Sequence, residues 1–251
     1  MTSVHGTPLD VPTPDGIADA YLAHPDDGRP RPGVLLYMDA FGLRPSLEAM
    51  ARRLAGHGYT VLVPNVLHRS GRAPVVELPE FIDPARRPEI FQRLFPLLQS
   101  LTPDLVVRDA GAYLAWLAAS PLVSDGPVGS TGYCMGGGLA LRTAAAFPDR
   151  VGAAAAFHTG RLVTDAEDSP HRLVGRIAAE LYFGHADQDQ SMTADQIKVL
   201  EGALDAAGVP YRSELYAGAH HGYTQTDTSA YDAEADGRHW RALLDLFERR
   251  L

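Results

Sequence analysis

Short apolar runs alternate along the chain with longer segments in which apolar residues recur every three or four positions. The short runs predict buried strands at residues 33–38, 59–63, 128–131, 151–157 and 180–183, and residues 211–216 alternate like an outer strand. The longer segments predict helices at residues 45–58, 90–98, 104–119, 135–147, 194–207 and 231–249. Strands separated by helices favour parallel pairing, so we predict an α/β fold with a mostly parallel central sheet and helices on both faces.

The chain length agrees with one folding unit. With 251 residues, we expect a single α/β domain that spans residues 1–251, because no internal repeat or low-complexity linker divides it. Residues 68–103 contain several prolines and one short helix candidate, so we expect them to form an insertion near the functional site. In sheets of this kind, ligands bind at the carboxyl ends of the strands.

Composition narrows the classes of partner and site. The net charge of −9 argues against nucleic acid and against an anionic membrane surface as partners. The single cysteine cannot form an internal disulfide, and no Cys/His cluster has the spacing of zinc ligands, so we expect no metal. The sequence has no apolar stretch of about 18 residues and no signal-peptide pattern at its start, which favours a cytoplasmic location. Nothing in the pattern indicates an oligomeric state.

The only cysteine stands in a motif that favours a reactive role. Gly132-Tyr133-Cys134-Met135-Gly136 has the form Gly-x-Cys-x-Gly, directly after a predicted strand and directly before a predicted helix. Such a tight turn forces strained dihedral angles on the nucleophile, and glycine on both sides removes the clashes that side chains would make. The thiol then projects beside the positive end of the helix, which favours the reactive thiolate. We interpret Cys134 as a catalytic nucleophile; a buried structural cysteine is the alternative.

A nucleophile at such a turn is followed along the chain by an acid and then by a histidine. His221 stands in the segment GAHHGY, in a glycine-bracketed loop after the predicted strand at 211–216, and we favour it as the base; its neighbour His220 is the alternative. The segment LYFGHADQDQSM offers Asp187 and Asp189 as the acid. The acid accepts the imidazole N–H, which fixes the tautomer and stabilises the imidazolium.

These residues resemble the dienelactone hydrolase family, a group of α/β-hydrolases with a cysteine nucleophile. GYCMGGG is similar to the family's nucleophile motif, and YAGAHHGYTQTDTSAYDAEADGRHW is similar to its histidine loop and last helix. In that loop the histidine directly precedes Gly-Phe or Gly-Tyr, which supports His221. Aligning the segment MTAD with the family's Val-Pro-Pro-Glu places the acid at Asp189, whereas counting from the preceding glycine gives Asp187, and we favour Asp189. The resemblance extends over roughly residues 10–250.

The resemblance also implies roles upstream of the cysteine. The segment MDAFG is similar to one in which a glutamate touches the resting cysteine, and the acid here is Asp39, one methylene shorter. The family implies an oxyanion hole formed by the backbone N–H groups of Met135 and Ala40, each contributing about 3 kcal/mol. The segment PNVLHR is similar to one that ends in an arginine for a substrate carboxylate, which falls on Arg69, although a plain surface arginine is an equal alternative. The second arginine of that clamp is replaced by Gln225, which implies a weaker anion site.

Together, these features predict a hydrolase of small carboxylic esters or lactones that works without a cofactor. The resemblance implies a Cys134–His221–Asp189 triad and a thioester intermediate that water hydrolyses. Two other functions are compatible with the sequence. The first is a non-catalytic ligand-binding or thiol-sensing protein of the same fold, which is suggested because Asp39 replaces the glutamate of the family and Gln225 replaces its arginine. An acyltransferase with the same triad would differ only in its acceptor.

Overall fold

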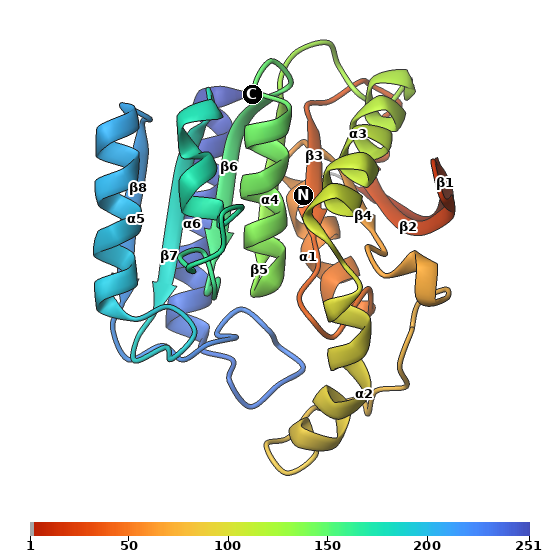
Figure 1. The fold of residues 1–251 in the computed structure, drawn as a ribbon. Coiled ribbons are helices and arrows are strands. Elements are labelled where there is room, and N and C mark those ends of the chain that lie inside the picture. Colours follow the sequence, from red (N-terminus) through yellow and green to blue (C-terminus); the bar gives the residue numbers. More distant parts are fainter. Residues whose placement is uncertain (1–2) are drawn as a thin grey trace.

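The computed structural model describes residues 3–251 (Figure 1). Within this range, eight strands form one sheet in the order β1-β2-β4-β3-β5-β6-β7-β8. The six that form its parallel part are β3 (Gly33–Tyr37), β4 (Thr60–Pro64), β5 (Val128–Tyr133), β6 (Val151–Phe157), β7 (Glu180–Ala186) and β8 (Tyr211–Tyr216). Strands β3, β4 and β5 are buried along their whole length, and β6 and β7 at all but one residue each, which explains the short apolar runs in the sequence.

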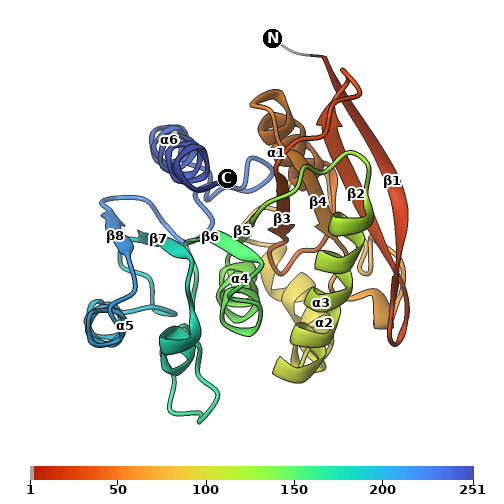
Figure 2. The same ribbon diagram turned by 90° about the horizontal axis from the view of Figure 1, so that it is seen from above.

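Helices cover both faces of the sheet (Figure 2). On one face lie α1 (Pro45–Gly56) and α6 (Ala233–Arg250), and on the other lie α3 (Pro103–Ala119), α4 (Met135–Ala146) and α5 (Ala194–Ala207). The prediction of an α/β fold with a mostly parallel sheet and helices on both faces is therefore confirmed. The predicted helices and strands recur with ends displaced by a few residues. Among residues 3–251, none of the helices combines the length and the apolar character that crossing a membrane requires.

The sequence pattern did not reveal the hairpin at one edge of the sheet. Strands β1 (Val4–Thr13) and β2 (Gly16–Pro25) pair antiparallel to each other, and β2 pairs antiparallel to β4. Strand β1 carries Pro8 and Pro12, which an edge strand tolerates but which obscure a strand in the sequence. Its mixed burial also lacks the continuous apolar run of the central strands.

Residues 68–103 lie toward the carboxyl ends of the parallel strands. They contain the short 3-10 helix η1 (His68–Ser70) and the helix α2 (Arg87–Gln99), which extends from the side of the molecule to which the β7 arrow points (Figure 1). This segment has a small apolar core of its own, formed with one residue from the loop after β3: Phe41, Val76, Ile82, Ile90 and Leu94. A second 3-10 helix, η2 (Pro170–Arg176), follows β6. Through Phe41, residues 68–103 pack against the loop after β3.

Candidate active site

Cys134 occupies the tight turn between β5 and α4. Its backbone has φ 53° and ψ −119°, a conformation that side-chain-bearing residues rarely adopt. The flanking glycines are needed for steric reasons: a Cβ on Gly132 would lie 2.0 Å from the Gly136 carbonyl oxygen, and a Cβ on Gly136 would lie 2.5 Å from the Met38 carbonyl oxygen. The spacing of the motif therefore reflects a real constraint on the chain, and the constraint holds Cys134 at the start of α4.

The loops after β7 and β8 bring together one acid and one histidine. His221 Nδ1 lies 2.6 Å from Asp189 Oδ2, and the other carboxylate oxygen, Oδ1, accepts hydrogen bonds from the Ser191 backbone N–H and hydroxyl. Asp187 instead accepts a hydrogen bond from the Gly218 N–H at 2.9 Å, which fixes the loop. The structure thus pairs His221 with Asp189, and the neighbouring His220 is exposed.

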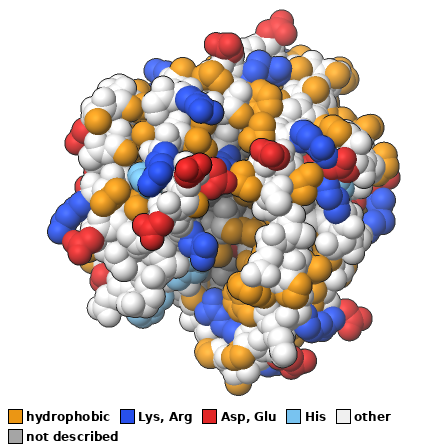
Figure 3. All heavy atoms as spheres, viewed as in Figure 1, with side chains coloured by type: hydrophobic (Ala, Val, Ile, Leu, Met, Phe, Trp, Pro, Cys, Tyr) orange, Lys and Arg blue, Asp and Glu red, His pale blue; other side chains and the backbone are white. Residues whose placement is uncertain are grey.

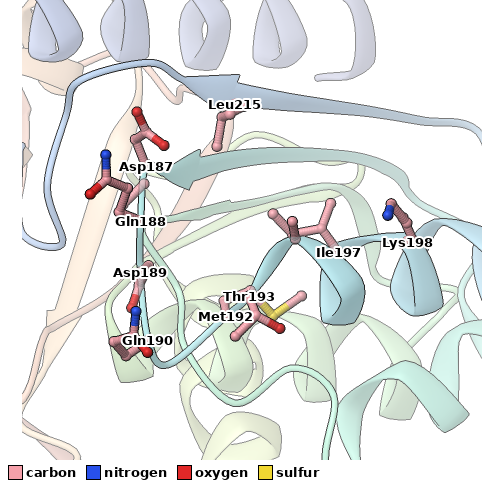
Figure 4. A pocket seen from close by; sticks show the side chains of 11 residues that line it. Asp187, Gln188, Asp189, Gln190, Met192, Thr193, Ile197, Lys198 and Leu215 are labelled. Carbon is pink, nitrogen blue, oxygen red and sulfur yellow. The ribbon is translucent and has the colours of Figure 1, made fainter.

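The two aspartates lie at different places along the same loop. Figure 4 shows Asp187 near Leu215, which belongs to β8, and Asp189 farther along the loop. A cavity of about 460 Å³ is lined by residues of this loop and of α5, but neither Cys134 nor His221 lines it. A different cavity, of about 590 Å³, is lined by Cys134, His221 and Asp189 together. The second cavity is therefore shared by the predicted nucleophile, base and acid.

The electrostatic surroundings of His221 favour its protonated form. Burial lowers its pKa, but the charge of Cys134, the charge of Asp189 and side-chain hydrogen bonds to both residues outweigh burial and raise the pKa from 6.5 to about 10. The same pairing acts in the opposite direction on the acid. Burial raises the pKa of Asp189, whereas the hydrogen bonds and charge of His221 and the bonds from Ser191 lower it to about 2. At neutral pH this geometry holds a carboxylate next to an imidazolium.

The sequence did not single out a further histidine that packs against His221. His158 follows β6, is fully buried, and has φ 39°. Its ring lies edge-on to the His221 ring with 5.3 Å between centroids, and its Nε2 lies 2.8 Å from the Thr224 hydroxyl. Burial lowers the pKa of His158 well below its ordinary value, so this imidazole is neutral at physiological pH. A neutral ring supports the His221 loop without adding a second charge to it.

Two backbone N–H groups, those of Met135 and Ala40, are the ones that the sequence predicts for stabilising an oxyanion. Met135 is the first residue of α4, and an N–H in a first helical turn has no partner within its helix. In the turn after β3, the Asp39 carboxylate accepts the Phe41 N–H and the Asp39 carbonyl accepts the Gly42 N–H. Ala40 lies between Asp39 and Phe41 and is buried, yet its N–H donates no hydrogen bond to any other residue in the range 3–251.

The Asp39 carboxylate accepts several hydrogen bonds. Arg44 donates to both of its oxygens at 2.8 and 2.9 Å and also pairs with Asp227, and the Gln225 amide donates to the same carboxylate. Among residues 3–251, these are its side-chain partners, and Cys134 is not one of them. The network joins the turn that holds Ala40 to the loop that holds His221. Neither Arg44 nor Asp227 has a local sequence signal that would reveal this role.

Arg69 does not line the cavity of Cys134. Its guanidinium donates to both oxygens of the buried Asp109 at 2.6 and 2.7 Å, and also to Asp15. Two carboxylates therefore occupy the donors that a substrate carboxylate would need. The anion clamp that the resemblance implies at Arg69 is not assembled, and its other position is Gln225, which binds Asp39.

The volume of the cavity that Cys134 lines, about 590 Å³, falls within the usual range of small-molecule sites. Helix α4 provides one wall, the loops after β6, β7 and β8 provide others, and α2 contributes Phe91. Figure 3 shows the surface hollowed near the middle of one face, with basic and acidic side chains around the rim. In the part of the chain that the structure describes, no group of three or more His, Cys, Asp or Glu side chains is arranged to hold a metal ion.

Comparisons with known proteins identify the family to which the chain belongs. The model of the dienelactone hydrolase family matches residues 18–251. The carboxymethylenebutenolidase of Rhodococcus opacus is 27% identical over 221 residues, which cover 87% of this chain and 81% of that protein. A dienelactone hydrolase-like promiscuous phosphotriesterase from metagenomic libraries has a similar structure, with a TM-score of 0.79, 24% identity and 99% of each chain covered.

The dienelactone hydrolase of Anabaena variabilis gives a TM-score of 0.69 at 20% identity, again over 99% of each chain. These structural likenesses show the α/β-hydrolase fold, and the family model shows the family. This protein therefore belongs to the dienelactone hydrolase family and is a carboxylic ester hydrolase.

Proposed function

We propose that the protein hydrolyses small carboxylic esters or lactones through a Cys134–His221–Asp189 triad and a thioester intermediate. The observation that carries this proposal is that Cys134, held at a strained turn, shares one cavity with His221, whose Nδ1 is bound to Asp189 at 2.6 Å. Nucleophile, base and orienting acid in this relation are the parts that acyl transfer requires.

In the first step, the Cys134 thiolate attacks the carbonyl carbon while the carbonyl electrons move to oxygen. The proton that left the thiol resides on His221, whose raised pKa of about 10 keeps the imidazolium populated at neutral pH. When the tetrahedral intermediate collapses, the C–O bond breaks and His221 donates its proton to the departing alkoxide. The products of this step are an alcohol and a Cys134 thioester; for a lactone, the alcohol stays attached to the acyl chain.

The oxyanion of the tetrahedral intermediate needs donors that are already oriented. We assign this role to the backbone N–H groups of Met135 and Ala40, which lie at the start of α4 and in the turn after β3. The Asp39 hydrogen bond to Phe41 shapes that turn, and Arg44 and Gln225 hold Asp39 in place. Each oriented donor of this kind typically contributes about 3 kcal/mol to transition-state stabilisation.

The second step reuses His221 as a base. Once Cys134 is acylated it carries no charge, so one of the causes that raise the pKa of His221 disappears. The neutral imidazole then takes a proton from water as the water oxygen attacks the thioester. Collapse breaks the C–S bond, releases the carboxylic acid and restores the thiolate–imidazolium pair.

The chemistry limits the substrates and the setting. A thiolate is a good leaving group, so activated esters and lactones are favoured over amides. The relative from Rhodococcus opacus carries the name carboxymethylenebutenolidase, and the lactone in that name is a first substrate to test. A free, reactive cysteine requires a reducing compartment, which supports a cytoplasmic location. The acidic net charge of −9 supports a small-molecule partner over nucleic acid.

The direct test is turnover of para-nitrophenyl acetate by the wild type and by Cys134→Ala. We expect the variant to lose turnover while its circular dichroism spectrum and thermal midpoint stay close to those of the wild type. Unchanged turnover in a folded Cys134→Ala protein would end the proposal. Stoichiometric labelling of Cys134 by iodoacetamide without any ester or lactone turnover would instead favour a thiol-sensing or ligand-binding protein.

A further inference from the structure

Helix α4 carries a line of cavity residues that begins at the nucleophile. Cys134, Gly138 and Arg142 are spaced four residues apart and therefore share one face of the helix, and all three line the cavity. Gly138 leaves the middle of this line open, because a Cβ built there would meet no atom within 4 Å. The cavity thus continues along α4 from Cys134 to the side chain of Arg142.

The Arg142 guanidinium is mostly buried, and its one ion pair within residues 3–251, with the exposed Asp168, is long. Its side chain is 14% exposed, and the nearest carboxylate atom, Asp168 Oδ2, lies 3.7 Å away, beyond hydrogen-bonding distance. Arg142 donates no hydrogen bond to any residue between 3 and 251. Burial lowers its pKa, with Asp168 opposing. The buried Arg44 shows the ordinary solution, since it pairs closely with Asp39 and Asp227.

A second guanidinium stands at the rim of the same cavity. Arg161, in the loop after β6, lines the cavity, is exposed, and forms no salt bridge with a residue of the described range. Its backbone has φ 59°, and its N–H donates to the Ser191 carbonyl at 2.8 Å, so the loop after β6 is tied to the loop of the acid. Leu139 and Phe91 line the same cavity and add apolar surface to its wall.

We propose that Arg142, assisted by Arg161, binds a carboxylate at the far end of the acyl chain of the substrate. The proposal rests on the function proposed above and names the substrate class of that site. The long ion pair with Asp168 leaves the hydrogen-bond donors of this mostly buried cation unsatisfied, and a bidentate carboxylate would satisfy them. Arg69 offers no such site, because Asp109 and Asp15 already occupy it.

The helix sets the length of the substrate. Eight residues separate Cys134 from Arg142, which is about 12 Å along the axis of an α-helix. The arginine side chain, about 6 Å long, leans toward the N-terminus of the helix and shortens that span to about 6–10 Å. A carboxylate bound to the guanidinium therefore lies several carbon atoms from the ester carbonyl. The substrate class is therefore monoesters of linear dicarboxylic acids of that length.

The test compares two matched substrates, the para-nitrophenyl monoester of octanedioic acid and the same compound with its distal carboxylate methylated. The wild type should prefer the anionic ester. In Arg142→Gln, we expect the ratio of kcat/KM for the anionic ester to that for the methylated ester to fall about tenfold or more, mainly through KM, because a charge-assisted hydrogen bond is lost. Arg142→Lys, which keeps the charge, should retain part of the preference.

Arg176→Gln is the matched control, since Arg176 is exposed, lies in η2 and does not line the cavity. It removes the same charge from the protein and should change the ratio less than twofold. Asp168→Asn gives a second readout that does not depend on the folding of the Arg142 variants: removing the neighbouring carboxylate should raise the ratio about two- to fivefold.

The result that overturns the subsite is an equal ratio in the wild type, Arg142→Gln and Asp168→Asn, with turnover that still depends on Cys134. Such a result would leave the hydrolase mechanism intact. Turnover of both esters that persists in Cys134→Ala would instead overturn the proposed function itself. The two failures are therefore distinguishable in one set of assays.

Discussion

Replacing Asp189 with asparagine tests the part of the site that the sequence left open. The structure places Asp189 Oδ2 2.6 Å from His221 Nδ1, whereas the Asp187 carboxylate accepts, within residues 3–251, the backbone N–H of Gly218 alone. The rise of the His221 pKa from 6.5 to about 10 corresponds to about 5 kcal/mol of preference for the imidazolium. Asp189 supplies part of this preference through its charge and its hydrogen bond, so its loss weakens the imidazolium and removes the group that orients the ring.

An asparagine amide also allows the imidazole to take the wrong tautomer, because the amide both donates and accepts. We therefore expect Asp189→Asn to lower kcat/KM for para-nitrophenyl acetate by about 50-fold or more and to lower the pKa of His221. Asp187→Asn, on the same loop, should stay within about threefold of the wild type. Steady-state kinetics and a histidine NMR titration provide the readouts. Nearly full activity in Asp189→Asn, or a loss that appears in Asp187→Asn instead, would show that Asp189 is not the acid that orients His221.

Three other predictions concern the nucleophile and its turn. Cys134→Ser should lower the pKa of His221, because the charge of Cys134 is the largest cause that raises it; an NMR titration that still gives about 10 would contradict this. In the wild type, kcat/KM should fall as pH rises through about 10, because the imidazolium that protonates the leaving group is lost above its pKa, and a pH–rate profile that stays flat to pH 11 would disagree. Gly136→Ala places a Cβ 2.5 Å from the Met38 carbonyl oxygen and should destabilise the fold by about 1–3 kcal/mol in urea denaturation. Gly138→Ala, whose Cβ meets nothing within 4 Å, should instead raise stability by up to about 1 kcal/mol, because alanine favours the helix, and an equal loss in both variants would contradict the steric argument.

The sequence predicted those parts of the site that depend on local geometry. The Gly-x-Cys-x-Gly spacing follows from a turn too tight for side chains, and the clashes that a Cβ would make at Gly132 and Gly136 are of that kind. The chain order of nucleophile, acid and histidine reduced the remaining choices to two aspartates and two adjacent histidines. The central strands were readable for a similar reason, because burial on both faces leaves a continuous apolar run.

The remaining parts depend on contacts between residues far apart in the chain, for which no local pattern exists. Arg44 binds Asp227, which lies 183 positions later in the chain, and it also binds Asp39, whose carboxylate accepts the Phe41 N–H. The partners of Arg69 on distant elements are equally invisible in its own segment. Similarly, an edge strand such as β1 gains its stability from pairing with β2, which its proline-containing sequence does not indicate.

The most direct test of the mechanism is to trap the acyl-enzyme and locate the acyl group. The wild type is mixed with an excess of an activated para-nitrophenyl ester, quenched in acid within the first turnover, and examined by intact-mass and peptide mass spectrometry. We expect one acyl group per chain, attached to Cys134 and released by hydroxylamine as a thioester is. An acyl group on any other residue, or rapid turnover in which Cys134 never becomes acylated, would contradict it.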